Sequence, residues 1–456
     1  MSLERADSHY LLGNYAPIAD EVTVTDLSVE GTIPQHLTGR YLRNGPNPLT
    51  AVDGSSHHWF LGDGMVHGIR LNQGRVDWYR NRYVGSDTVA LHRGQSGFAG
   101  PNWMGGAIGP NTHVAGFAGR TFATMEAGAP PVELSYELDS VARTDFDGTL
   151  PNGYSGHPKY DPVTRGLHTA AYAWPHLDHV QYLIQSPDAL VSHVVEVPVP
   201  GMTMMHDMSF TERYAVFYDQ PVTVDFDMVA TSAFPFGWNP DYGNRVGFLD
   251  RTSLPPGRSR ANDVVWVDVP LGYTFHPLNA FDDPSTGHVV IDLCRYDKMF
   301  DKRRNGPFGE GAARLERWTI DVNRRTTSVD VVDDAPNEFP QHAPSVGGRP
   351  YRFGYTASLS PDLTTGWPTH KHDLHSGERR VFDHGPGRAC GEPVFTARPD
   401  ATAEDDGWLM ALVHDLGTES TEFVIWDAQD FDRGYVAQVK VPQRVPFGFH
   451  GSWVND

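Results

Sequence analysis

The sequence is a succession of short segments in which hydrophobic and polar residues alternate, and most of these segments end at Gly, Pro, Asn or Asp. Alternation with a period of two is typical of β-strands that bury one face. Such segments recur from one end of the chain to the other, for example VHGIRL (66–71), RVDWYRNRYV (75–84), ERYAVFYDQ (212–220), GHVVIDLCRY (287–296) and GWLMALVHD (407–415). With 46 glycines and 35 prolines among 456 residues, long helices are few and a helical bundle is excluded. We therefore predict an all-β protein.

A chain of this length made of successive hairpins must protect the edges of its sheets. It can close a barrel, stack sandwiches, or arrange its sheets radially as a β-propeller. Seven four-stranded blades would take about 65 residues each, a comfortable spacing for 456 residues. No change in composition divides the chain, so residues 1–456 are predicted to form one domain. The pattern alone leaves the propeller and the stacked sandwiches as alternatives.

One stretch, residues 222–249, interrupts the alternation because it is apolar, aromatic and broken by prolines. We expect an inserted loop or short helices at this place, too irregular for a blade. The insertion could form a tunnel wall in a cover over one face, touch a membrane, or simply pack over the core.

Charge and cysteine content restrict the partners and the compartment. Lys and Arg number 36 against 57 Asp and Glu, and the net charge of −21 repels phosphate backbones, so no nucleic-acid partner is expected. Cys294 and Cys390 allow at most one disulfide and no cysteine-based metal site. The N-terminus, MSLERADSHYLLGNY, is charged where a secretory signal is apolar, and no apolar run reaches about 18 residues. These features predict a soluble, cytoplasmic protein.

The familiar local motifs of hydrolases and nucleotide-binding enzymes are missing from the sequence. Gly62-Asp63-Gly64 is followed by His67 where a dinucleotide fingerprint needs glycine, and no strand–helix alternation follows it. There is no G-x-S-x-G, H-E-x-x-H, phosphate-binding loop or pair of C-x-x-C motifs. A nucleophilic side chain is therefore not expected.

Histidine is unusually frequent, with 22 residues, and four of them share a distinctive setting. Each lies among small or aromatic residues near the end of an apolar strand-like segment: His157, His206, His276 and His450. A single histidine in such a setting is usually a hydrogen-bonded core residue. In a propeller, however, the innermost strands line one axis, so one inward histidine from each of four blades would meet there. By contrast, HKHDLH (370–375) is predicted to be a solvated surface turn.

Several ordered motifs from about residue 18 to the C-terminus resemble the carotenoid cleavage oxygenases, a family that includes apocarotenoid, epoxycarotenoid and stilbene dioxygenases and the retinoid isomerase of the eye. They are GRYLRNGPNP (39–48), WFLGDGMVH (59–67), SGHPKYDP (155–162), MMHDMSFTERYAVF (204–217), FHPLNAFDD (275–283), NEFPQ (337–341), GEPVFTARP (391–399) and FGFHGSWV (447–454). The resemblance implies a seven-bladed β-propeller with a dome of loops and short helices over one face.

The same resemblance implies one Fe(II) ion per chain on the propeller axis, held by the four histidines. It also implies three glutamates behind the ligands, with Glu126 paired to His206, Glu338 to His276 and Glu392 to His450. Neutral imidazoles suit Fe(II) but leave its charge uncompensated in a dry site. A carboxylate that accepts the distal ring N–H spreads that charge, fixes the tautomer and strengthens the ligand.

Four ligands leave two of six octahedral positions free, one of them for O2. The resemblance places Thr112 near the other, where its methyl group would limit the binding of water; alternatively, Thr112 is an ordinary strand residue. Family members act by inserting both atoms of O2 across one C=C bond, which gives two carbonyl products. The implied enzyme is thus a dioxygenase with iron as cofactor and O2 as co-substrate.

The substrate is expected to be a hydrophobic small molecule. Members that cleave hydroxylated stilbenes carry a lysine directly before the first of the three glutamates, where this chain has Met125. A carotenoid or apocarotenoid is therefore favoured, in a tunnel lined by apolar side chains that could equally be core: Trp59, Phe60, Met125, Phe234, Phe236 and Trp238. The alternatives are a stilbenoid or phenylpropene dioxygenase, a polyene isomerase, and a non-catalytic propeller that serves as a binding platform. We expect a monomer, with peripheral membrane contact as one interpretation of residues 222–249.

Overall fold

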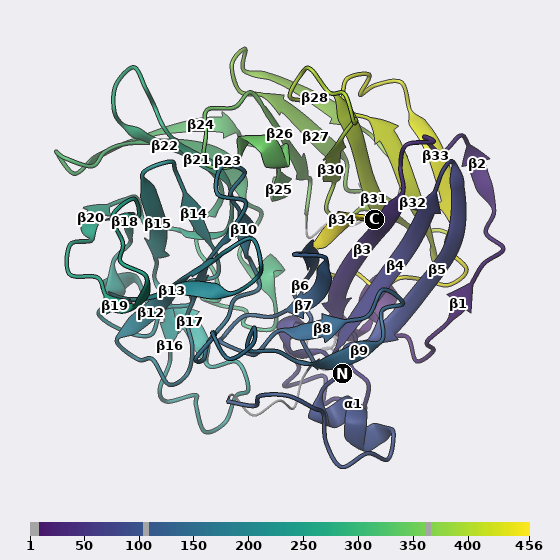
Figure 1. Ribbon diagram of the computed structural model, residues 1–456, viewed down its shortest axis with the longest axis horizontal. Coiled ribbons are helices and arrows are strands. Elements are labelled where there is room, and N and C mark those ends of the chain that lie inside the picture. Colours follow the sequence, from purple (N-terminus) through teal and green to yellow (C-terminus); the bar gives the residue numbers. More distant parts are fainter. Residues whose placement is uncertain (1–8, 104–108, 361–365) are drawn as a thin grey trace.

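Seven β-sheets surround a central axis in the computed structural model, which describes residues 9–103, 109–360 and 366–456 (Figure 1). The prediction of an all-β, seven-bladed propeller is confirmed. The first part of the charged N-terminal stretch, residues 1–8, lies outside the described residues. No helix in the described ranges is long and apolar enough to cross a membrane.

Six of the blades follow one another along the chain, each beginning near the axis and running outward. The first blade consists of β6 (His113–Phe117), β7 (Arg120–Thr124), β8 (Val132–Leu134) and β9 (Ser140–Arg143). The second consists of β10 (Lys159–Tyr160), β11 (Leu167–Ala171), β12 (His179–Gln185) and β13 (Val191–Pro198), with β19 (Gly257–Arg260) parallel to β13. The third consists of β14 (Met208–Phe210), β15 (Tyr214–Asp219), β18 (Arg245–Asp250) and β20 (Val265–Asp268).

The next three blades complete the series. The fourth blade consists of β21 (Tyr273–Asp282), β22 (Val289–Tyr296), β23 (Arg314–Asp321) and β24 (Thr326–Asp333). The fifth consists of β25 (Glu338–Gln341), β26 (Phe353–Ala357), β27 (Thr369–Asp373) and β28 (Glu378–Phe382). The sixth consists of β29 (Arg388–Cys390), β30 (Val394–Ala397), β31 (Gly407–Asp415), β32 (Ser420–Asp427) and β33 (Tyr435–Lys440), with β2 (Val29–Gly31).

The seventh blade closes the ring because it joins the two ends of the chain. Its strand order is β1-β5-β4-β3-β34, from β1 (Thr23–Val24), β3 (Gly39–Pro46), β4 (Gly64–Asn72), β5 (Arg75–Tyr83) and β34 (Gly451–Asn455). The C-terminal strand β34 is antiparallel to β3, with Gly39 opposite Asn455 and Arg43 opposite Gly451 (Figure 1). In the sixth blade, the N-terminal strand β2 pairs with β33 at the outer edge of the sheet. The two pairings join N-terminal strands to C-terminal strands, one in the seventh blade and one in the blade that contains β33.

Local sequence explains individual hairpins. Between β4 and β5, the two-residue loop Gln73-Gly74 has φ angles of 48° and 84°. This is the left-handed conformation that a tight type I′ turn requires, and it matches the twist of the flanking strands. Between the blades, large side chains fill the core; Trp318 of β23 and Trp426 of β32 are fully buried.

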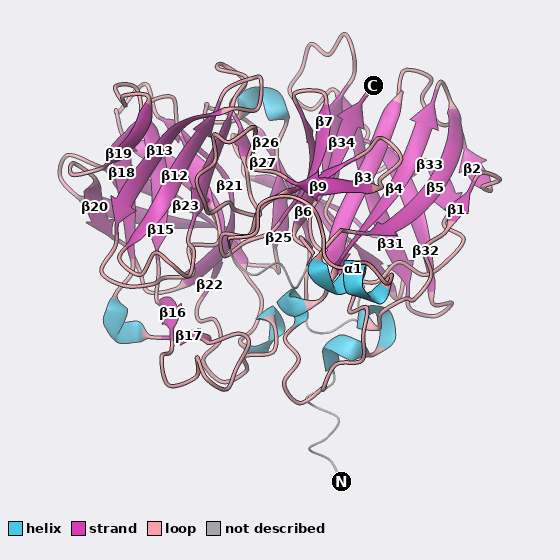
Figure 2. Ribbon diagram, turned by 60° about the horizontal axis from the view of Figure 1, so that its bottom comes forward, coloured by secondary structure: helices cyan, strands magenta, loops and turns pink. Residues whose placement is uncertain are grey.

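One face of the propeller carries the predicted dome. Figure 2 shows helix α1 (Asp87–His92) and the ribbon of β16 (Val222–Val224) and β17 (Phe236–Trp238) on this side. The remaining short elements are single 3-10 turns: η1 (His9–Leu11), η2 (Gly13–Tyr15), η3 (Trp59–Leu61), η4 (Pro240–Tyr242), η5 (Pro307–Gly309) and η6 (Pro344–Val346). Because these turns are short, the blades themselves consist almost entirely of β-strands.

The expected insertion at residues 222–249 is shorter than predicted. The β16–β17 ribbon and η4 do lie outside the blades, but residues 245–249 belong to β18, which pairs with β15 and β20 inside a blade. The sequence hides this boundary because the strand RVGFLD continues the apolar, aromatic composition of the ribbon.

The prediction that HKHDLH is a solvated surface turn is wrong. His370, Lys371 and His372 are buried in β27, an interior strand of its blade, and only His375 is exposed. Neighbouring strands cover both sides of β27, and this cannot be read from a polar segment by itself. Cys294 and Cys390 are both buried free thiols.

We predict that ring closure carries much of the stability. Removing residues 451–456 deletes β34 and leaves the edge of β3 unpaired, so we expect a large fall in melting temperature or loss of cooperative unfolding in circular dichroism. Deleting only Asp456 removes a partly exposed ion pair with Arg70 and should cost about 0–1 kcal/mol. Equal melting of the full chain and the longer truncation would contradict this role of β34.

Candidate metal centre

Four histidines enter the axis from four different blades. His157 and His206 each lie two residues before an innermost strand, β10 and β14. His450 directly precedes β34, and His276 lies within β21, where the register to β22 shifts between Thr274 and Pro277. Because innermost strands line the axis of a propeller, these positions bring side chains separated by up to 293 residues onto one point.

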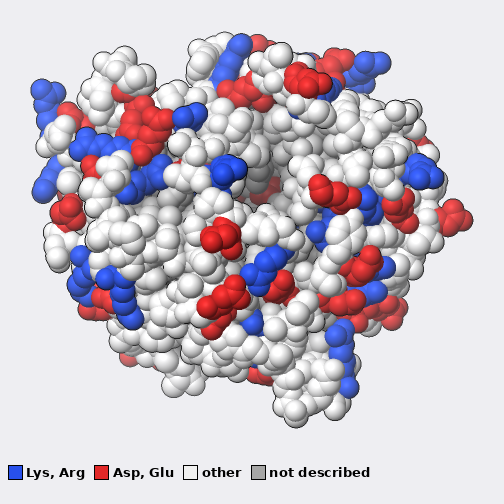
Figure 3. All heavy atoms as spheres, in the orientation of Figure 1, with Lys and Arg blue, Asp and Glu red and all other residues white. Residues whose placement is uncertain are grey.

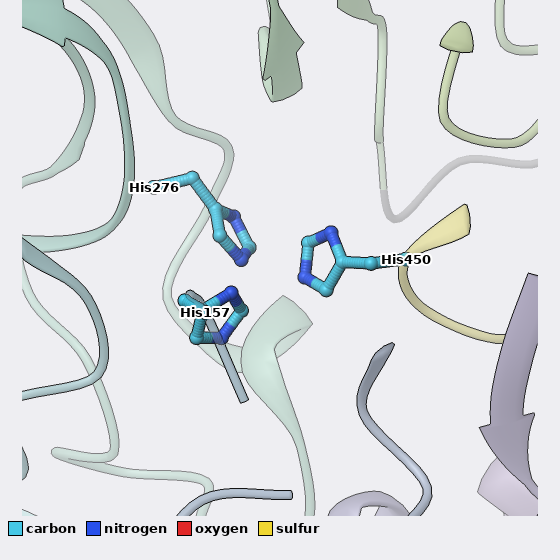
Figure 4. A group of neighbouring side chains, drawn as sticks. All are labelled: His157, His276 and His450. Atoms are coloured by element: carbon cyan, nitrogen blue, oxygen red, sulfur yellow. The ribbon is translucent and has the colours of Figure 1, made fainter. Parts of the chain in front are cut away.

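The imidazoles are packed against one another. Ring centroids lie 4.3 Å apart for His157 and His206, and 4.7 Å apart both for His157 and His450 and for His276 and His450. The Nε2 atoms of His206 and His276 are separated by 3.1 Å. Figure 4 shows the rings of His157, His276 and His450 converging on one region. In each of the triads His157–His276–His450 and Glu126–His157–His206, ligand atoms lie within 4.8 Å of one another.

Burial makes these histidines suitable ligands. Their exposed fractions are only 6–8%. Burial, reinforced by the neighbouring histidines, lowers the pKa of His157 and of His276 well below the usual value, so both are neutral near pH 7. The Nε2 of His157 is buried and finds no hydrogen-bond partner among the described residues. A cation between the rings would satisfy these nitrogens.

Three carboxylates lie behind three of the rings. Nδ1 of His276 is 2.5 Å from Glu338 Oε2, Nδ1 of His450 is 2.9 Å from Glu392 Oε1, and Nδ1 of His206 is 2.8 Å from Glu126 Oε1. A carboxylate at Nδ1 holds the proton there and leaves the Nε2 lone pair free for a metal. These are the same three pairs that the resemblance implied.

The carboxylates are themselves held in place. Glu392 accepts hydrogen bonds from the Gly451 N–H at 2.7 Å and from Gln341 Nε2 at 2.8 Å. Glu338 accepts the Phe339 N–H at 2.7 Å, and burial raises its pKa to about 7. Neutral imidazoles backed by carboxylates form a donor set that fits a divalent ion such as Fe(II). The residues present therefore fit the implied metal.

Thr112 lies at the edge of this centre. Its carbonyl accepts the N–H of His450 at 3.1 Å, which ties it to the last histidine. Its Cγ2 would be only 2.5 Å from a Cβ added at Gly156, the residue before His157. Glycine at position 156 thus makes room for the Thr112 methyl group beside the histidines. That this methyl group limits the binding of water at one coordination position of the metal stays a prediction.

An apolar cavity of about 150 Å³ reaches the histidines from the side of the dome. Five of the six predicted tunnel residues line it: Trp59, Phe60, Met125, Phe234 and Phe236. The sixth, Trp238, is not among the lining residues and packs on the neighbouring core. The cavity walls come from several blades and from the β16–β17 ribbon, so most of their contacts form only in the folded chain.

Other aromatic residues of this cavity were missed by the sequence reasoning. Phe275 and Phe449 line it, and each directly precedes one of the histidines. Both could have been predicted as cavity residues, because each is the direct neighbour of a predicted ligand histidine. Trp174 and Leu359 also line the cavity, but neither lies in a motif that pointed to the site.

A second cavity approaches the centre from the opposite face. It has a volume of about 1000 Å³, it is more polar, and it includes Lys159, Glu392 and Ser452 in its walls. His276 and His450 line both cavities. Figure 3 shows the central hollow on this open face of the propeller. The histidine centre therefore separates an apolar space under the dome from a polar one.

Comparison with known proteins agrees with this geometry. The family model described as retinal pigment epithelial membrane protein matches residues 15–455. A carotenoid cleavage oxygenase of Mycobacterium tuberculosis is 39% identical over 97% of both chains. A carotenoid 9,10(9',10')-cleavage dioxygenase of Crocus sativus is 30% identical over 98% of this chain and 89% of the relative.

Solved structures of the same shape include the lignostilbene dioxygenase of Pseudomonas brassicacearum, with 28% identity, 98% coverage of both chains and a TM-score of 0.85. The cobalt-substituted apocarotenoid oxygenase of Synechocystis has 26% identity, covers 96% of this chain and 97% of its own, and has a TM-score of 0.84. The chain therefore belongs to the retinal pigment epithelial membrane protein family, and it is an enzyme of the carotenoid cleavage dioxygenase type.

We predict that the carboxylates tune the metal centre. Glu338→Gln keeps the size of the side chain but removes the charge behind His276, so affinity for Fe(II) should fall about 10–100-fold. The measurement is anaerobic titration of metal-free protein, with Glu310→Gln, outside the histidine centre, as control. Unchanged affinity in Glu338→Gln would show that this carboxylate does not act on the ion.

Proposed function

Because the chain belongs to this family, we propose that it cleaves one C=C bond of a carotenoid or apocarotenoid with O2 and releases two carbonyl products. The observation that carries the proposal is an apolar cavity that ends at a cluster of four buried histidines, three of which line the cavity and have a carboxylate behind them. We propose Fe(II) as the ion held by His157, His206, His276 and His450. When bound, this ion would supply the activation of O2.

The residues around the centre have three tasks in this reaction. Glu338 and Glu392 hold the proton on Nδ1 of His276 and His450. Glu126 adds a carboxylate 2.8 Å from Nδ1 of His206. The aromatic walls, including Phe60, Phe275 and Phe449, hold a polyene and exclude water. No side chain has to transfer a proton to the substrate or attack it, which agrees with the lack of a nucleophile motif.

The carotenoid preference rests on the chemistry of the cavity wall. At the position directly before Glu126, where stilbene-cleaving members carry lysine, Met125 faces the cavity. A methionine offers no ammonium group to a phenol oxygen, and it packs readily against an apolar chain. The cavity therefore suits a substrate without a phenol at this point.

A second candidate is a stilbenoid or phenylpropene dioxygenase. It is favoured by the close match in shape to the lignostilbene dioxygenase of Pseudomonas brassicacearum, at a TM-score of 0.85. The two candidates share one scaffold and one metal centre, so they differ only in what the cavity walls recognise.

We propose that the protein acts as a cytoplasmic monomer that takes its substrate from a lipid surface. Phe226, which is 68% exposed, and Val229, which is 47% exposed, both belong to the chain between β16 and β17 in the dome. Apolar side chains exposed together beside a cavity mouth are typical of a surface that touches membrane.

Incubation of the iron-loaded protein with a panel of apocarotenals and hydroxystilbenes tests the function. We expect paired aldehyde or ketone fragments from a polyene, both labelled when ¹⁸O2 is supplied, as measured by chromatography and mass spectrometry. Fragments from hydroxystilbenes alone would establish the second candidate. A rearranged polyene without label would instead identify an isomerase, and no turnover with any substrate would support a binding platform.

Met125→Lys tests the basis of substrate choice. The new ammonium group should bind a phenol oxygen and lower the fit of an apolar chain, so kcat/KM is expected to rise for a hydroxystilbene and to fall for an apocarotenal. Met125→Leu, which stays apolar, is the matched control and should keep the original preference. An identical preference in Met125→Lys and Met125→Leu would exclude a role of this position.

A further inference from the structure

A second cluster of ligand-type side chains lies away from the axis, between two neighbouring blades. Asp333 is the last residue of β24, the outer strand of one blade, and His370 and His372 belong to β27 of the next blade. Residues two apart on a strand point to the same face, so both histidines are directed toward Asp333. The exposed fractions of the three side chains are 6%, 4% and 3%.

The carboxylate of Asp333 is only half satisfied. Its Oδ1 accepts hydrogen bonds from Arg379 Nη1 at 2.7 Å and from the Ala335 N–H at 3.0 Å. Its Oδ2 is buried and forms no hydrogen bond with the described residues. Nδ1 of His370 lies 3.7 Å from this oxygen and Nδ1 of His372 lies 4.0 Å from it. A buried anionic oxygen in this state costs free energy unless a cation or proton is supplied.

The hydrogen bonds on the far side of His372 determine which of its nitrogens carries the proton. Thr356 donates its hydroxyl proton to Asn337 Oδ1 at 2.6 Å. The Nε2 of His372 lies 3.2 Å from this Asn337 oxygen and 3.1 Å from the Thr356 oxygen, and both act as acceptors toward it. The proton of a neutral His372 is therefore on Nε2, and the Nδ1 lone pair faces the free carboxylate oxygen.

The three ligand atoms of Asp333, His370 and His372 all lie within 4.8 Å of one another. A lone pair and an anionic oxygen that face each other across 4.0 Å without a proton between them repel each other. A cation in the gap would turn this arrangement into an attractive one.

We propose that Asp333, His370 and His372 form a second metal site, which takes a divalent transition ion of the Zn²⁺ type and links two blades. Two histidines and one carboxylate are a donor set that Zn²⁺ accepts at bond lengths of about 2.0–2.2 Å. Neighbouring ligands of such an ion are about 3.4 Å apart, which is close to the observed 3.7 Å and 4.0 Å between the carboxylate oxygen and the two histidines. All three ligand atoms lie within 4.8 Å of one another, so the side chains would have to move closer together around the ion.

The surrounding residues define how the ion would be held. Arg379 stays on Oδ1, so Asp333 would bind through Oδ2 alone. His372 already presents its free Nδ1. His370 now has Nδ1 at 3.0 Å from Asn337 Oδ1, and it would exchange this partner for the ion by moving its proton to Nε2. The site neither shares a residue with the axial centre nor depends on the proposed function.

The experiment is titration of the metal-free full-length protein with Zn²⁺ and Co²⁺, with stoichiometry from calorimetry and tetrahedral coordination from the visible spectrum of Co²⁺. We expect two ions per chain in the wild type. Asp333→Asn and His372→Gln should each bind one ion fewer, whereas Asp334→Asn, an exposed neighbouring carboxylate, should bind as the wild type does. His276→Ala should lose the other ion and keep this one.

A thermal measurement adds a readout for the link between blades. Zn²⁺ should raise the melting temperature of His276→Ala, because an ion that binds only the folded state stabilises it, and should leave His276→Ala/Asp333→Asn unchanged. The proposal is overturned if Asp333→Asn binds as many ions as the wild type, or if the wild type binds a single ion that His276→Ala abolishes. If the wild type binds one ion and Asp333→Asn binds none, the result supports the site at Asp333 and contradicts metal binding at the axis.

Discussion

The charge balance around four buried imidazoles is the constraint on which the rest of this structure depends. Imidazole ligands bring no negative charge of their own, so the charge of a divalent ion between them would have to be compensated from outside the ligand ring. Glu126, Glu338 and Glu392 provide that compensation at 2.5–2.9 Å from three ring nitrogens. Backbone N–H groups then hold two of the carboxylates, which ties the centre to the innermost strands.

The propeller is the architecture that makes this possible. Each innermost strand reaches the axis once, and each of four blades contributes one histidine at or near the start of that strand. The register shift around His276 turns its side chain to the axis within a strand, whereas the other three precede their strands. Ring closure through β34 has a direct chemical consequence, since His450 and the Gly451 N–H arrive together with that strand.

The position of the centre between two unlike cavities also bears on chemistry. The cavity under the dome is narrow and apolar, and the cavity on the open face is wide and polar. A hydrophobic substrate is therefore directed to one side of the histidines, while water and ions have access from the other side. Substrate choice depends on few wall residues, such as Met125, because the family shares the remaining scaffold.

Much of the protein could be predicted from the sequence because strand formation is local. Alternation with a period of two, ended by Gly, Pro, Asn or Asp, indicated the strands, and motif resemblance pointed to four histidines and three glutamates that the fold places close together. Contacts between blades were not predictable in the same way. The burial of His370 and His372, the end of the insertion before β18 and the cavity roles of Trp174 and Leu359 depend on residues far away in the chain. Their neighbours are chosen by the packing of one blade on the next, which no local pattern records.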